Sequence, residues 1–158
     1  MKASGQDALR TAFEENYVPL MRLCGLLCGS RELAEDIVQE VFVRVALRID
    51  RVAPDRIPNY LRAAVVNEWK NRVRRLAIER RFVWLHHVSV PQTDTAIEER
   101  DLLWNAVRAL PNRQRACLVL RYYEGLTERE TAQVLGCSVG TVKSQTKRAM
   151  TKIREALK

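Results

Sequence analysis

The sequence predicts an all-α protein built from two small helical domains. Apolar residues recur at helical spacing along most of the 158 residues, and no stretch of useful length alternates in the manner of a β-strand. Glycine and proline punctuate this pattern so that about four helices fall in each half. We expect a first domain at residues 1–83, a linker at 84–96 and a second domain at 97–158.

The composition suits a folded protein that does not enter a membrane. Hydrophobic residues make up 47% of the chain, which is enough to build a core. No apolar run approaches the ~18 residues that a membrane span needs, and the N-terminus lacks the apolar segment of a secretion signal. We therefore expect a cytoplasmic protein without membrane insertion.

The net charge of +8 is concentrated in two blocks. Residues 57–87 carry seven basic and two acidic side chains, and residues 136–158 carry six and one. The rest of the chain is close to neutral. Two separate basic segments on one small chain are candidates for two contacts with the same polyanion.

The first third of the chain predicts three helical segments. One opens at Ser4 and runs through Tyr17, where Pro19 should force a kink or a fresh start. A second apolar stretch ends at Gly29, a suitable C-terminal cap, and Ser30 then suits the N-cap of the next helix.

The helix after Ser30 has one apolar and one acidic face. Its inward stripe is formed by Leu33, Ala34, Ile37, Val38, Val41, Phe42 and Val45. Its outer face carries Glu32, Glu35, Asp36, Gln39 and Glu40. An acidic helix face is most often merely solvated, so charge alone assigns it no function.

A basic helix follows the loop at residues 50–58, with Pro58 in its first turn. We expect its core face to hold Val65, Val66, Trp69, Val73 and Leu76. The opposite side carries Asn67, Asn71 and Arg74, with Lys70, Arg72 and Arg75 nearby. Asparagine can hydrogen-bond base edges and arginine attracts phosphates, so this face could contact nucleic acid. Trp69 could stack on an unpaired base, but its phase favours the core.

The last third predicts a helix-turn-helix. Helices are expected from Glu98 to Ala109 and from Pro111 to Gly125. Thr127 with Glu130 forms a capping box for a short helix, which Gly136 ends. Ser138 then caps a longer second helix, and this arrangement is typical of a DNA-binding motif.

The second helix of this motif presents a basic and hydroxyl face to solvent. Its apolar side holds Val142, Thr146, Ala149, Met150, Ile153 and Leu157. The opposite side holds Ser144 and Arg148, flanked by Thr141, Lys143, Lys147 and Thr151. Lys, Arg, Ser and Thr on a helix at this position suit the major groove of DNA.

Taken in order, these segments resemble a bacterial sigma factor of the extracytoplasmic-function type, in its minimal two-domain form. AEDIVQEVF (34–42) is similar to the family's polymerase-binding segment of region 2. PNYLRAAVVNEWKNRVRR (58–75) is similar to the helix that recognises the −10 promoter element. LPNRQRACLVLRYYEGLTERETAQVLGCSVGTVKSQTKRA (110–149) resembles region 4, which recognises the −35 element, and its GCSVGTVKSQT resembles an actinobacterial, SigE-like subgroup.

The resemblance implies three sets of site residues. Contacts to core RNA polymerase fall on Glu35, Asp36, Gln39 and Glu40. Contacts to the −10 DNA, where a base is flipped out of the stack, fall on Asn67, Lys70, Asn71, Arg74 and Arg75. Contacts to the −35 DNA fall on Thr141, Lys143, Ser144, Gln145, Lys147 and Arg148. Many family members have arginine at position 145 and an aromatic residue or histidine at 147, so the −35 sequence does not carry over.

The resemblance implies a sigma factor that directs promoter-specific initiation and helps to melt DNA, and that is not an enzyme. The expected partners are core RNA polymerase, promoter DNA and an anti-sigma factor. No cofactor, metal or small-molecule substrate is expected. One alternative is a regulator with a LuxR-like helix-turn-helix, which leaves AEDIVQEVF and the second basic helix unexplained. Another is a redox sensor at Cys24 and Cys28, or a zinc site that adds His86 and His87 to them. Four-residue spacing of the cysteines on an apolar helix instead favours buried small hydrophobes.

Overall fold

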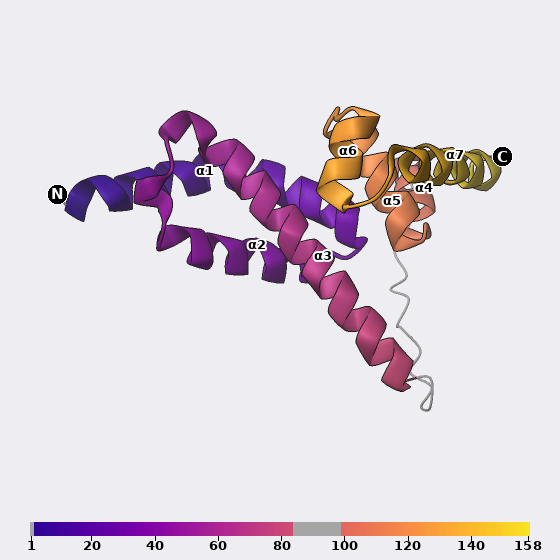
Figure 1. Cartoon of the computed structure of the whole chain (residues 1–158), viewed down its shortest axis with the longest axis horizontal. Coiled ribbons are helices and arrows are strands. Elements are labelled where there is room, and N and C mark those ends of the chain that lie inside the picture. The colour runs from indigo at the N-terminus through magenta and orange to yellow at the C-terminus, as the bar shows by residue number, and fades with distance from the viewer. Residues whose placement is uncertain (1, 84–98) are drawn as a thin grey trace.

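The computed structural model describes residues 2–83 and 99–158, and its ordered elements are helices grouped into two domains (Figure 1). The first domain contains α1 (Lys2–Cys28), α2 (Arg31–Ala46), the short 3-10 helices η1 (Ile49–Arg51) and η2 (Pro54–Arg56), and α3 (Ile57–Val83). The second contains α4 (Glu99–Arg108), α5 (Asn112–Leu118), the π-helix η3 (Val119–Tyr123), α6 (Glu128–Leu135) and α7 (Val139–Ala156). The predicted all-α, two-domain fold class is confirmed. The predicted linker at 84–96 lies outside the described residues.

The first domain is a three-helix bundle in which α1, α2 and α3 pack on one another. Six of the seven apolar residues predicted for the inward stripe of α2 are buried, and Leu33 is half-buried. Trp69 on α3 is also buried, so its side chain belongs to the core and is not free to stack on a base.

Helix α1 is continuous, and the predicted fresh start at Pro19 is wrong. Proline removes the hydrogen bond that its own nitrogen would donate to the carbonyl of Glu15. Pro19 and Glu15 both lie on the exposed side of the helix, where water can satisfy that carbonyl. Tertiary packing of the opposite side, through the buried Leu20 and Leu23, holds the helix together across the proline.

The turn between α1 and α2 follows the predicted caps. Gly29 adopts the left-handed conformation with φ of 65°. The Ser30 hydroxyl accepts a hydrogen bond from the backbone nitrogen of Leu33. A Cβ on Gly29 would also lie 3.2 Å from the guanidinium of Arg115, so this position combines a backbone requirement with a steric one.

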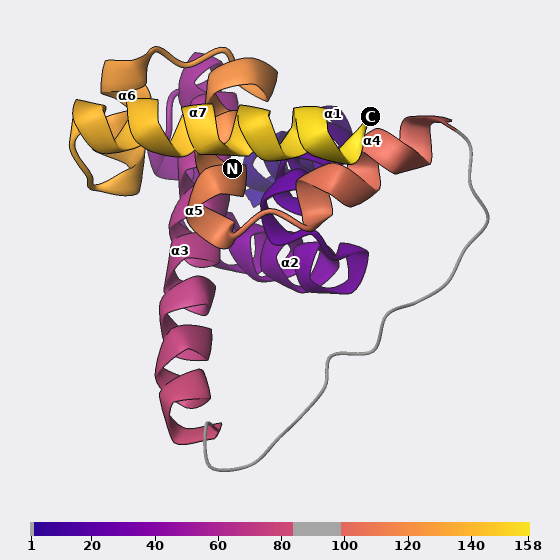
Figure 2. The ribbon, with the colours of Figure 1, turned by 90° about the vertical axis from the view of Figure 1, so that its right-hand side faces the viewer.

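The last turns of α3 extend past the other helices (Figures 1 and 2). Leu76 lies on this extension and is 42% exposed, so its predicted place in the core is wrong. The helical phase of Leu76 is apolar, but α1 and α2 do not reach far enough to cover it. Exposed basic and polar residues, Asn71, Arg74 and Arg75, share this part of the helix.

The second domain contains the predicted helix-turn-helix. The capping box is present, because Thr127 and Glu130 each accept a hydrogen bond from the other's backbone nitrogen. Gly136 ends α6 with φ of 65°, and Ser138 caps α7 by accepting from Thr141. The π-helix before Gly125 was not predicted, because an apolar periodicity does not distinguish it from α-helix. Leu157 lies at the end of α7 and is 48% exposed, which corrects its assignment to the apolar face.

The two domains are docked through Arg115 of α5. Arg115 is only 6% exposed, and its guanidinium donates to five acceptors. Two of them, the carbonyls of Leu27 (2.8 Å) and Cys28 (3.3 Å), lie at the C-terminal end of α1. The other three lie in the second domain, at the carbonyls of Arg108 and Leu110 and the side chain of Asn112. Nearby, Val119 and Leu120 pack into the core of the first domain.

We predict that Arg115→Ala loosens this docking. The change leaves buried carbonyls without donors, and each bond from a charged group is worth about 1.5–3 kcal/mol, so unfolding should become easier by roughly 3 kcal/mol. Urea unfolding measures this loss, and small-angle scattering should show a larger radius of gyration.

Arg108→Ala is the matched control for this prediction. Arg108 donates one exposed hydrogen bond across the same boundary, to the carbonyl of Gly29 at 2.8 Å. Its loss should cost less than about 1 kcal/mol. An Arg115 variant that is as stable and as compact as the Arg108 variant would contradict the role given to Arg115.

Candidate nucleic-acid and protein interfaces

The predicted polymerase-binding residues on α2 fall into two kinds. Asp36 and Gln39 are exposed and point outward from the bundle. Glu35 accepts from Arg31 one turn earlier, at 3.1 Å. Glu40 accepts from Arg44 and from Arg72 of α3, and the hydrogen bond from Arg72 is the main cause that lowers the pKa of Glu40. Asp36 and Gln39 are therefore the side chains most available to a protein partner.

Two apolar residues, one in α2 and one at its C-cap, extend the same stripe and were missed from the sequence. Val43 and Leu47 are 71% and 84% exposed. They follow Asp36 by seven and eleven residues, which places them on its side of the helix. Apolar residues outside the buried stripe were the signal that could have identified them. An acidic stripe with an apolar end suits a protein interface better than a merely solvated surface.

The predicted −10 residues lie along one side of α3. Asn67, Asn71, Arg74 and Arg75 are exposed, and Lys70 is half-buried. Asn67 borders a hollow of about 220 Å³ whose lining includes the aromatic ring of Tyr60 and the cationic side chains of Arg44 and Arg48. A ring and cations beside an amide are groups that stack on a base and attract its phosphate.

Part of this side of α3 faces the second domain. Lys70 donates to the carbonyl of Val134 on α6 at 2.7 Å. Arg62 lies 3.6 Å from the carboxylate of Glu124. Asn67 also borders a cavity of about 470 Å³ between these elements. The docked second domain thus occupies cationic groups on the side of α3 that was predicted to contact DNA.

The predicted −35 residues lie on the outer side of α7. Lys143, Ser144, Lys147 and Arg148 are exposed, whereas Thr141 and Gln145 are half-buried. Lys143 lies 3.8 Å from Glu128, and both groups are well exposed, so this pair contributes little stability and can dissociate at low cost. The side chain of Ser144 donates to the Thr141 carbonyl of its own helix.

The two candidate DNA surfaces meet at the domain boundary. Thr141 and Gln145 of α7 line the same cavity, about 170 Å³ in volume, as Lys70 and Arg74 of α3. A recognition helix makes its base contacts mainly through its N-terminal residues. In this arrangement that end of α7 faces the other domain, so the structure brings together two surfaces that were predicted independently.

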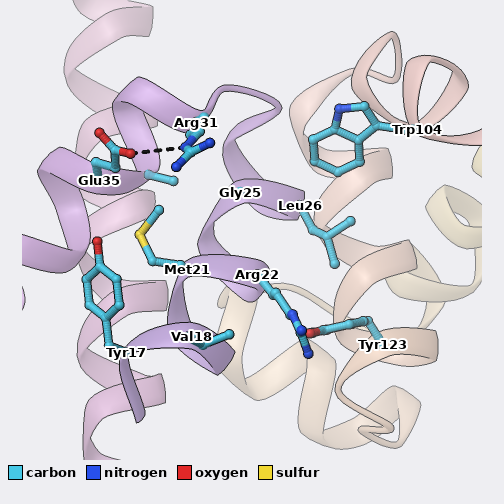
Figure 3. Close-up of a pocket in the computed structure, with 11 residues that line it drawn as sticks. Tyr17, Val18, Met21, Arg22, Gly25, Leu26, Arg31, Glu35, Trp104 and Tyr123 are labelled. Atoms are coloured by element: carbon cyan, nitrogen blue, oxygen red, sulfur yellow. Dashed lines mark hydrogen bonds and ion pairs between the residues drawn. The ribbon is translucent and has the colours of Figure 1, made fainter. Parts of the chain in front are cut away.

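An apolar groove of about 560 Å³ opens on another side of the molecule (Figure 3). Met21, Gly25 and Leu26 of α1 form its floor, and Trp104 of α4 and Tyr123 of η3 approach from the second domain. The Arg31–Glu35 ion pair lies at one edge. Because both domains supply its walls, the groove exists only while they are docked, and no pattern in the sequence predicted it.

The two buried cysteines, Cys24 and Cys117, do not have the properties of a reactive sensor. The sulfur atoms of Cys24 and Cys28 lie 3.7 Å apart as free thiols. The hydrogen bond between them, with burial, raises the pKa of the Cys24 thiol, and burial raises the pKa of Cys117 to about 11. Protonated thiols are poor nucleophiles and poor metal ligands.

Across residues 2–83 and 99–158 we find no cluster of three metal-ligating side chains and no helix long and apolar enough to span a bilayer. His86 and His87, considered for a zinc site, lie outside these ranges.

Comparison with known families accounts for both domains. The family described as Sigma-70 region 2 matches residues 12–78, and the family described as Sigma-70, region 4 matches residues 100–153. The first match covers α2 and most of α3, which a LuxR-like regulator would leave unexplained. The second covers most of α7, including the candidate DNA-contacting residues on it.

Individual proteins agree with these matches. The chain is 37% identical to the RNA polymerase sigma-E factor of Streptomyces avermitilis, over 90% of this chain and 84% of the relative. It is 31% identical to the ECF RNA polymerase sigma factor EcfG of Rhodopseudomonas palustris, over 89% and 80%. Among solved structures, sigma factor RpoE of Bartonella quintana, in complex with the anti-sigma factor NepR, has the same fold with a TM-score of 0.69. That likeness covers 94% of this chain and 95% of the other, at 20% identity.

We predict that Arg148→Ala weakens binding to duplex DNA. If Arg148 makes a bidentate contact to a base, losing that contact should cost about 1–3 kcal/mol of binding free energy on the matched sequence and relax specificity. If Arg148 contacts only a phosphate, its loss should instead weaken binding to all sequences alike and reduce the salt dependence by roughly one contact. Titration of matched and altered duplexes at several salt concentrations distinguishes the two.

Arg154→Ala serves as the control, since Arg154 is also exposed on α7 but outside the predicted set. Equal behaviour of the Arg148 and Arg154 variants on every duplex would remove Arg148 from the recognition surface.

Proposed function

This chain belongs to the sigma-70 family of RNA polymerase sigma factors, in its extracytoplasmic-function class, and we propose that three of its surfaces bind polymerase and the two promoter elements. As a sigma factor, it directs promoter-specific transcription initiation with RNA polymerase. Our proposal assigns polymerase binding to α2, −10 recognition to α3 and −35 recognition to α7. The domains they belong to are 1–83 and 97–158, with 84–96 as the linker.

The polymerase contact is the outward stripe of α2. Asp36 and Gln39 offer a carboxylate and an amide, Glu40 adds a second carboxylate, and Val43 and Leu47 add exposed apolar area. Glu35 lies at the edge of this stripe in its ion pair with Arg31. The single observation that carries this assignment is the exposure of such a mixed stripe on a helix whose other side is packed. A basic and partly apolar surface would complement it.

We predict that Asp36→Lys abolishes stable binding to core polymerase. Exposed substitutions usually change stability by less than about 0.5 kcal/mol, so the variant should remain folded. Like charges at an interface cost several kcal/mol, or ~100-fold or more in affinity. Co-elution with core polymerase and circular dichroism measure the two effects.

Glu155→Lys makes the same change of charge on the exposed side of α7 and should leave core binding intact. Lysine at Glu40 is a less clean test, because it would also break internal ion pairs with Arg44 and Arg72. Wild-type core affinity in the Asp36 variant would refute the assignment of α2.

The −10 contact is the side of α3 that carries Asn67, Asn71 and Arg74. We propose that Asn67 holds the edge of an unstacked base, because it borders the hollow with Tyr60, Arg44 and Arg48. Trapping a base outside the stack lets a protein that melts DNA select its sequence. Lys70, Arg74 and Arg75 would contact phosphates beside it.

We predict that Asn67→Ala reduces transcription from closed duplex promoters more than from templates with a pre-opened −10 bubble of altered sequence. Transcription from a set of −10 variants should also become less selective, because the amide that holds the base is lost. Asn105→Ala, an exposed asparagine of α4, is the control. If the Asn67 variant discriminates among −10 sequences as well as wild type, the assignment fails.

We infer that the domains separate when both promoter elements are bound. The element names place them about 25 base pairs apart, which at ~3.4 Å per base pair is roughly 80 Å. In the docked arrangement Gln145 and Arg74 line one small cavity. The −10 and −35 contacts therefore cannot form together without breaking the contacts of Lys70 and Arg115 across the boundary.

We also propose an anti-sigma factor as an inhibitory partner, acting in the cytoplasm where polymerase is found. The sigma factor of Bartonella quintana described above was solved with such a protein. The apolar groove between Met21, Leu26, Trp104 and Tyr123 is the site we assign to it (Figure 3). A segment bound there would favour the docked arrangement of the domains, in which α3 and α7 cannot bind the two promoter elements together. No catalytic step or cofactor enters this function.

A further inference from the structure

A buried carboxylate lies between the proposed polymerase and −10 surfaces. Glu68 of α3 is 1% exposed, and three guanidinium groups surround it. Arg44 of α2 lies 3.0 Å from one carboxylate oxygen, and Arg72 and Arg75 lie 3.2 Å and 3.3 Å from the other. A carboxylate at this depth is tolerated only with such partners. The function assigned above gives Glu68 no role.

Glu40 closes this cluster at the surface. One of its oxygens accepts from Arg44 at 2.7 Å, and the other accepts from Arg72 at 2.6 Å. Arg44 and Arg72 each bridge the two glutamates, so the four side chains form a ring. Glu68 is its buried end, and Glu40, with 42% of its side chain exposed, is its outer end.

The ring connects two surfaces that bind different partners. Glu40 lies on the stripe of α2 assigned to polymerase, next to Gln39. Arg72 lies on α3 among the residues assigned to −10 DNA, one position after Asn71. With both glutamates in place, Arg72 has a carboxylate at Nε and another at Nη2, and little of its charge is left for a phosphate. Hydrogen bonding to Glu40 is the main cause that raises the pKa of Arg72.

We propose that Glu40 withholds Arg72 from DNA in the free protein, and that a basic group of the polymerase, on binding Glu40, releases Arg72 to the phosphates near the −10 element. Glu68 is the positioning residue that keeps the guanidinium at this site by its Nε while Nη2 changes partner. Adding a polymerase cation to Glu40 weakens its attraction for Arg72, because three cations, the added one with Arg44 and Arg72, then share the two oxygens of one carboxylate. Binding to polymerase thus increases the number of phosphate contacts. This inference rests on the proposed assignment of α2 and α3.

The test removes the charge of Glu40 without polymerase. Full-length Glu40→Gln is titrated with a labelled forked −10 DNA at several salt concentrations. Glu35→Gln is the matched control, since Glu35 lies on the same helix and loses the same charge, but its partner Arg31 belongs to α2 itself. We expect Glu40→Gln to bind roughly 3- to 10-fold tighter than Glu35→Gln. The slope of log K against log salt should steepen by about one phosphate contact.

A double-mutant cycle identifies the arginine. When Glu40 is present, Arg72→Gln should reduce DNA affinity only slightly. When Glu40 is replaced by glutamine, Arg72→Gln should abolish the increase in DNA affinity that Glu40→Gln produces. The amide introduced by Arg72→Gln can still donate to Glu68, and circular dichroism with thermal unfolding checks that each variant is folded. Equal affinities for the Glu40 and Glu35 variants would overturn the proposal, as would a gain that persists without Arg72. Because polymerase is absent, either failure leaves the Asp36 test of core binding untouched.

Discussion

The arrangement of this protein depends on how the guanidinium of Arg115 is buried. It is paired with carbonyl oxygens and one amide, and two of the carbonyls lie at the C-terminal end of α1. That end of a helix carries partial negative charge and carbonyls that lack intrahelical donors, so a cation there satisfies both. Burial is the main cause that lowers the pKa of Arg115. Its five hydrogen-bond acceptors stabilise the charged guanidinium at this buried position. One side chain therefore links the end of the first helix of the first domain to the start of α5.

This docking has a functional consequence because of what lies at the boundary. Lys70 and Arg74 of α3 and the first turns of α7 all face it. Lys70 and Arg74 bring positive charge to this boundary, whereas Arg115 bonds to carbonyls of α1, and Val119 and Leu120 pack into the core of the first domain. In the docked form, the phosphates of a promoter would compete with the other domain for these basic groups. A ligand of the apolar groove would therefore increase the population of the docked form, and promoter DNA would decrease it.

Charge within the first domain also connects separate helices. The sequence indicated an acidic face on α2 and a basic helix α3 as separate features. In the structure Glu40 and Arg72 join them, and the buried Glu68 was not distinguished from its neighbours by any periodic pattern. A glutamate between apolar Val66 and Trp69 was the available signal, since such a residue is buried only with partners.

The helical class, the caps and the helix-turn-helix could all be predicted from the amino-acid sequence. These features depend on short-range chemistry, in which Thr127 with Glu130, Gly136 and Ser138 each act within one turn. The apolar stripe of α2 was equally predictable, because helical phase assigns it. The continuity of α1 through Pro19, the exposure of Leu76 and the docking by Arg115 became known only from the packed structure. Each of these depends on where a neighbouring helix lies or ends, and that is set by contacts between residues far apart in the chain, which local periodicity does not encode.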